Sequence, residues 1–134
     1  MGIRYEKDTI LNWINEMGKF LRLLVDKYEA FDEPAEPAVV EEGYRNFFGK
    51  DRDWLLGLPQ NELLTYVEQE LQTEQIRPLA LLFLRDALLS PADETQQQLL
   101  RNSKFLLEHV SQKLGSFSFE DYGNLTLIAE RLQK

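Results

Sequence analysis

The stretch PLALLFLRDALL, which spans Pro78 to Leu89, decides the fold. Wound as a helix, it presents apolar side chains on nearly every side, and such a helix must lie at the centre of a domain. Arg85 and Asp86 interrupt the run, and it is too short to cross a bilayer. We therefore expect a helical domain built around this segment, with no membrane partner and no lipid anchor.

Proline and capping residues indicate the helix boundaries on either side of this segment. Pro78 is predicted to open the central helix and Pro59 the helix before it, because proline suits the first turn. Ser90, Pro91 and Asp93 follow the order of an N-cap, a proline at the first helical position and an acid facing the helix dipole. The next helix is therefore predicted to begin with Ser90 as its N-cap.

The remaining sequence predicts the end of this helix and one more helix after it. Gly115 is suited to end the helix that begins at Ser90, and Ser118 to cap the last helix, with Asp121 three positions later. Phe117 and Tyr122 are spaced for a hydrophobic staple at that cap. The buried face of the helix that begins at Ser90 is predicted to comprise Leu99, Ser103, Leu106, Val110 and Leu114. Because no alternating run is flanked by hairpin turns, the predicted fold class is all-α, a bundle of five to six helices.

A long amphipathic helix is predicted from about Ile3 to Phe31, where apolar residues recur every seven positions. Its apolar arc is too wide for one neighbour, so it must be buried against its own domain, a partner chain, or both. Gly18 costs about 1 kcal/mol relative to alanine within a helix, which suggests that another helix approaches closely there or that the helix bends. The candidate partner-binding surface comprises Trp13, Met17, Phe20, Leu24 and Tyr28.

Residues 29–42 break this pattern, with six acidic side chains, no basic one and two prolines. We interpret the break as a surface linker, and an acidic interaction tail is the alternative. The prediction is therefore one domain, 1–134, made of an N-terminal helix (1–31), an acidic linker (32–38) and a helical core (39–134). Because the linker separates the first helix from the core, that helix need not be buried by the core alone.

Four aromatic side chains are crowded between positions 44 and 54, namely Tyr44, Phe47, Phe48 and Trp54. They either fill one end of the helical core or form a patch that docks a partner, since aromatic residues anchor interfaces. The sequence favours the core and leaves the interface open.

Composition and charge argue against several classes of function. The net charge is −8, from 23 acidic and 15 basic residues, whereas nucleic-acid binders present a basic face. The chain has no cysteine, which excludes disulfides and thiolate zinc sites and suits the cytoplasm. His109 is the only histidine, and Ser103 and Ser111 are spaced so that neither faces it on one helix. We predict no catalytic residue, no metal ligand and no cofactor.

Two resemblances add to this interpretation. The last segment, Phe119 to Leu132, resembles the second helix of a tetratricopeptide unit, in which a small residue such as Ala129 allows close packing, and Ala80 is placed to do the same earlier. The opening Ile3-Arg4-Tyr5 with Asp8 and Ile10, and the later Phe48-Gly49-Lys50-Asp51, resemble a family of small uncharacterised bacterial helical proteins with a domain of unknown function. In this chain the acidic linker separates the two motifs. The resemblance implies a bacterial origin, a tetratricopeptide-like C-terminal half of stacked antiparallel helix pairs, and no activity.

Three hypotheses of function follow from these observations. The first is a non-enzymatic protein–protein interaction or structural module that binds a partner, or itself as a homodimer, through the N-terminal helix. The second is a small-molecule binder or enzyme with an inter-helical pocket, for which the stacking side chains would be Trp13, Tyr44, Trp54 and Tyr66. The third is a regulator that contacts nucleic acid through a local patch, although the overall charge disfavours it.

Overall fold

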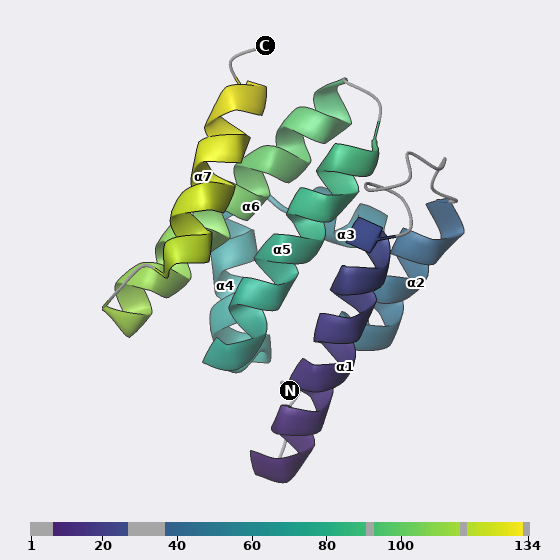
Figure 1. Cartoon of the computed structure of the whole chain (residues 1–134), viewed down its shortest axis with the longest axis vertical. Coiled ribbons are helices and arrows are strands. Elements are labelled where there is room, and N and C mark those ends of the chain that lie inside the picture. The colour runs from purple at the N-terminus through teal and green to yellow at the C-terminus, as the bar shows by residue number, and fades with distance from the viewer. Residues whose placement is uncertain (1–6, 27–36, 91–92, 116–117, 133–134) are drawn as a thin grey trace.

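The computed structural model describes residues 7–26, 37–90, 93–115 and 118–132, and its regular elements are all helices (Figure 1). They are α1 (Lys7–Leu24), α2 (Pro37–Phe48), α3 (Arg52–Leu56), α4 (Gln60–Glu70), α5 (Thr73–Leu89), α6 (Glu94–Leu114) and α7 (Phe119–Leu132). The all-α prediction is confirmed. Within the described ranges there are seven helices, more than predicted, because α3 forms a short helix of its own. The tetratricopeptide-like arrangement stays a prediction.

Helix α5 is the central element, as its sequence predicts. Figure 1 shows it between α1 and α6, and it packs against both of them. Its fully buried apolar side chains are Ile76, Leu79, Ala80, Leu82, Phe83, Leu84 and Ala87. Burying a side chain of the size of leucine or phenylalanine contributes about 1.5–3 kcal/mol, so this helix supplies much of the apolar stabilisation.

The prediction that Pro78 opens α5 is wrong, because the helix begins at Thr73 and Pro78 lies inside it. A reciprocal capping box starts the helix, in which the backbone N–H of Gln72 donates to Oε1 of Gln75 at 2.9 Å. Glutamine is an unusual N-cap residue, so the sequence did not signal this start. Pro78 has no N–H, and it cannot donate to the carbonyl of Glu74 one turn earlier.

Helix α6 runs back along α5 (Figure 1). Of its predicted inner face, four residues are buried, and Ser103 donates its hydroxyl to the carbonyl of Ala80 at 2.7 Å. Leu114 does not belong to this face, since it is 53% exposed. Gly115 ends the helix at a φ of 77°, as predicted, because a left-handed residue there costs glycine little.

The junction between α5 and α6 differs from the sequence prediction. Asp93 is the N-cap of α6, since its carboxylate accepts from the backbone N–H of Gln96 at 3.1 Å. Ser90 instead closes α5, donating its hydroxyl to the carbonyl of Asp86 at 2.7 Å. The predicted first residue, Pro91, lies outside the described residues. Two capping residues thus lie close together, and aspartate, not serine, starts the second helix.

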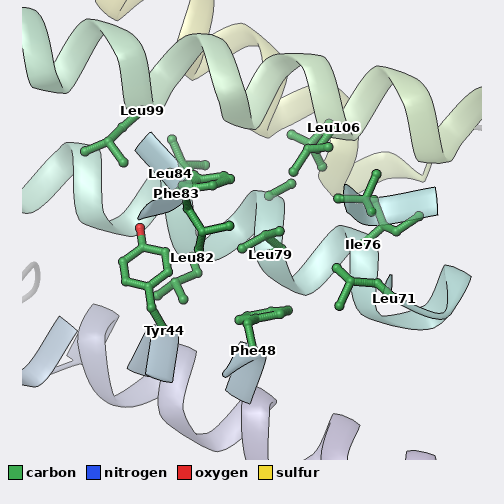
Figure 2. Packing of buried hydrophobic residues seen from close by; sticks show 14 of the residues in the cluster. Tyr44, Phe48, Leu71, Ile76, Leu79, Leu82, Phe83, Leu84, Leu99 and Leu106 are labelled. Atoms are coloured by element: carbon green, nitrogen blue, oxygen red, sulfur yellow. The ribbon is translucent and has the colours of Figure 1, made fainter. Parts of the chain in front are cut away.

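The aromatic cluster divides between core and surface. Tyr44 and Phe48 reach from α2 towards α5 and are buried (Figure 2), so the core interpretation holds for these two. The hydroxyl of Tyr44 donates to Asp86 at 2.7 Å, and burial raises its pKa well above the usual range. Arg52 makes two further bonds to the same carboxylate. Trp54 remains 43% exposed, with the Lys50 ammonium 4.5 Å from its ring centroid.

Helix α7 begins with the predicted cap. The backbone N–H of Asp121 donates to Oγ of Ser118, and the N–H of Ser118 donates to the Asp121 carboxylate, each at 3.1 Å. The partner proposed for Tyr122 in a staple, Phe117, lies outside the described residues. Ile128 is buried, whereas Ala129 is exposed, so close packing of a small residue is not found at that position. Among the described helices, none is long and apolar enough to cross a membrane.

Candidate functional site

The predicted partner-binding surface on α1 is largely buried within the domain. The exposed fraction is 8% for Trp13 and zero for Met17 and Leu24. The indole N–H of Trp13 donates to the carbonyl of Phe47 at 3.1 Å. The prediction is therefore wrong at these three positions, because α2 and α5 cover the seam that the sequence left unassigned. A homodimer through this seam would have to displace them.

The two remaining residues of the predicted surface are Phe20 and Tyr28. Phe20 is half-buried, with its ring centroid 5.6 Å from that of Phe47. It lies over Gly43, where an added Cβ would come within 2.5 Å of the Phe20 ring. An alanine at position 43 would therefore require the Phe20 ring to move. Tyr28 lies outside the described residues.

Gly18 has a different environment from the one predicted. A Cβ placed on it would meet nothing within 4 Å, so no described helix approaches closely there. It faces instead a groove of about 800 Å³ between α1, α5 and α6, which we call the α5 groove. It is lined by Ile14, Met17, Gly18 and Leu21 of α1, Thr73, Glu74, Arg77, Pro78 and Leu81 of α5, and Lys113 and Leu114 of α6. Six of these eleven residues have apolar side chains.

The floor of the α5 groove follows from the helical period of α5. Thr73, Arg77 and Leu81 recur every four positions and so lie along one face. Pro78 also lies on that face, and because proline has no backbone N–H it cannot donate a hydrogen bond to the carbonyl of Glu74. The groove is mainly apolar in its lining, with Glu74, Arg77 and Lys113 as its charged residues.

Two cations of the groove form ion pairs with carboxylates that do not line it. Arg77 makes two hydrogen bonds to Asp121, Nε–Oδ1 at 3.1 Å and Nη2–Oδ2 at 2.8 Å. Burial raises the pKa of Asp121, but the bonds from Arg77 and the Ser118 amide lower it more, so that it lies below its ordinary value. Lys113 donates to Glu68 at 2.8 Å and, with His109 on the other oxygen, lowers the pKa of that carboxyl.

A second hollow of about 520 Å³ adjoins the α5 groove along α1. It shares Ile14 and Gly18 with the groove and adds Asn15, Lys19 and Arg22. Lys19 lies 3.4 Å from Glu16, in an ion pair exposed on both sides. The two hollows give α1 a continuous open face on the side away from the α1–α2 seam.

The stacking side chains proposed for a small-molecule pocket do not line the α5 groove. Tyr44 and Trp13 fill the core, and Tyr66 packs edge-on against Trp54 with ring centroids 5.5 Å apart. His109 pairs with Glu68 and stacks near Phe105, as an edge histidine does. Among the residues described, no group of three His, Asp or Glu side chains could hold a metal ion.

Sequence reasoning did not find the α5 groove, although two of its signals were visible. Gly18 within a helix and Pro78 within an apolar run each break a local preference, and both line the groove. Comparison with known proteins finds no matching family model, no matching curated protein and no matching solved structure.

Proposed function

We propose that this protein is a non-enzymatic interaction module, and that its α5 groove receives an apolar segment of a partner protein. The observation that carries the proposal is the open wall at Gly18, which lies in an apolar-lined groove with free space on its α1 side. A glycine in the middle of a helix costs about 1 kcal/mol. Close approach of an occupant's backbone would offset that cost, since glycine is the residue that permits it.

The charged groups of the groove favour binding over catalysis. Arg77 and Lys113 are engaged by carboxylates from α7 and α4, and those carboxylates have lowered pKa values. A general base works best with a pKa near the operating pH, which usually requires a raised carboxyl pKa. The shifts at Asp121 and Glu68 run in the opposite direction. Both carboxylates therefore hold cations in place, a role that suits a binding surface.

A second candidate is a site for a small apolar molecule. Small-molecule sites measure roughly 300–1,000 Å³ and combine apolar walls with a few polar groups, and the groove, at about 800 Å³, falls in that range. The bacterial origin and the tetratricopeptide-like stacking implied by the resemblance belong to the proposal as well. So does a cytoplasmic location, which is supported by the absence of cysteine.

Site-specific photo-crosslinking in the native cell tests the proposal. A photoreactive side chain replaces Leu114, which lines the groove and is exposed, and in a control it replaces Glu130, exposed on α7. We expect a protein adduct from position 114 only. The adduct should disappear in Gly18→Leu, which places a bulky side chain in the groove, and persist in Gly18→Ala.

Gly18→Ala should fold at least as well as the parent, because it removes a helical glycine and its Cβ meets nothing within 4 Å. We expect Gly18→Leu to fold as well, since its side chain extends into the groove. A lipid or small-molecule adduct in place of a protein would favour the second candidate. A protein adduct that survives Gly18→Leu, or that forms equally at position 130, would refute the proposal. An adduct with a second copy of this chain would identify the groove as a homodimer interface.

A further inference from the structure

The charges around the α5 groove are opposite in balance to those of the whole chain. The two adjoining hollows are lined by four cations, Lys19, Arg22, Arg77 and Lys113, and by one acid, Glu74. The chain as a whole has 15 basic and 23 acidic residues. A basic rim around an apolar groove on an acidic protein is selective, because it attracts negative charge locally while the rest of the surface repels it.

The cations on α1 are available to an occupant. The Lys19–Glu16 pair is long and exposed on both sides, and exposed pairs of this kind contribute little. Arg22 is exposed and forms no ion pair with the residues that the structure describes. Arg77 and Lys113 have counter-ions, Asp121 and Glu68, but neither carboxylate lines either hollow, and Asp121 is 1% exposed. An occupant of the groove would therefore meet the Arg77 guanidinium rather than the Asp121 carboxylate.

We infer that the occupant of the α5 groove is an acidic amphipathic helix of a partner protein, with its apolar side chains in the groove and its carboxylates towards Lys19 and Arg22. The inference rests on the proposed function and names the chemistry of the partner. An amphipathic helix laid in a groove is a recurring mode of peptide recognition. Charge complementarity across such an interface sets specificity and association rate more than affinity.

The geometry of α1 sets the length and orientation of this helix. The residues that line the two hollows run from Ile14 to Arg22, which corresponds to roughly 12 Å at 1.5 Å per residue. About two turns of a partner helix would cover this distance. Gly18 lies at its midpoint, so the partner backbone crosses α1 there.

A selection with a displayed peptide library tests the inference on the full-length protein. Each member is a 14-residue helix with leucine at positions spaced three and four apart and with Glu, Gln or Lys varied at the flanking positions. We expect groove-dependent binders, defined as those lost with Gly18→Leu and kept with Gly18→Ala, to be enriched in Glu by about tenfold over Lys. Their Kd should rise with salt, because the rim contacts are exposed.

A charge reversal with a matched control completes the test. For a selected peptide, the double variant Lys19→Glu/Arg22→Glu should weaken binding about threefold to tenfold. The control Arg101→Glu/Lys104→Glu changes the net charge equally on the exposed side of α6, and should have little effect. Groove-dependent binders with no preference for Glu, or equal effects of the two double variants, would overturn the acidic helix but leave the interaction module standing. A selection without groove-dependent binders, with no protein adduct at position 114, would overturn both.

Discussion

Helix α7 depends on the ion pair between Arg77 and Asp121, and this dependence yields a quantitative prediction. The side chain of Asp121 is 1% exposed and that of Arg77 31%. Breaking a buried pair by removing one partner costs about 3–5 kcal/mol, since a charge is left uncompensated. In Asp121→Asn the unpaired guanidinium is about one-third exposed and water can solvate it, so we expect a smaller loss of about 2 kcal/mol.

The variant that removes the other partner of the pair, Arg77, should be less stable than Asp121→Asn. Arg77→Met leaves the buried carboxylate of Asp121 without its cation, and we expect a loss of about 3–4 kcal/mol in the free energy of unfolding. The double variant should lose less than the sum of the two, because the pair is a single interaction that each variant already removes. Urea unfolding followed by circular dichroism measures all four proteins, with stability compared at constant m-value.

The difference in stability between the parent and Asp121→Asn should depend on pH. The pKa of Asp121 is lowered in the fold from its ordinary value of 3.8, so its contribution to stability is present above that value and is lost as the pH falls through the folded pKa. The difference between the parent and Asp121→Asn should therefore shrink below about pH 4. A loss under 0.5 kcal/mol (roughly the noise of a surface substitution), strict additivity in the double variant, or a difference that grows in acid would refute this reasoning.

Three further variants test other parts of the structure by the same unfolding assay. Phe83→Ala should cost about 3–5 kcal/mol, since the ring is fully buried in α5, and a cost below 1 kcal/mol would mean that the core is not closely packed there. Pro78→Ala should add about 1 kcal/mol by giving the carbonyl of Glu74 a donor, and an unchanged stability would show that this carbonyl is already bonded. Glu68→Gln should lose less than about 1 kcal/mol at neutral pH, because the pair with Lys113 is exposed. The ordinary pKa of this carboxyl is 4.5, and the fold lowers it, so the loss should fade as the pH drops below that value. A loss that persists at lower pH would come from packing and not from the charge of Glu68.

The sequence predicted those parts of the fold that local chemistry determines. The central position of α5 follows from its apolar surface on every side, and the end of α6 at Gly115 from the backbone freedom of glycine. The cap of α7 follows from the spacing of Ser118 and Asp121. Each of these depends on a few neighbouring residues. The start of α5 was missed because glutamine caps are rare, and a proline one turn later gave a stronger but misleading signal.

The site was harder to predict because it depends on which faces meet. The seven-residue pattern of α1 correctly indicated buried positions at Met17 and Leu24. It could not show that α2 and α5 of the same chain would cover them, since a helix seam looks the same against its own domain or a partner. The groove borders this seam, since Met17 belongs to both, and its floor at Arg77 and Pro78 comes from α5, which is distant in sequence.

The packing of α1 on α5 also has a consequence for the order of folding. Helices α5 and α6 are neighbours along the chain and share extensive contact, so their pairing closes only a short loop. The contact between α1 and α5 joins segments separated by residues 25–72, and the entropy lost on closing a loop grows with its length. We therefore expect the α5–α6 hairpin to form most readily, and α1 to gain its contacts with α5 only after that helix has been made. During synthesis, α1 therefore leaves the ribosome before the helix that covers its α5-facing side chains.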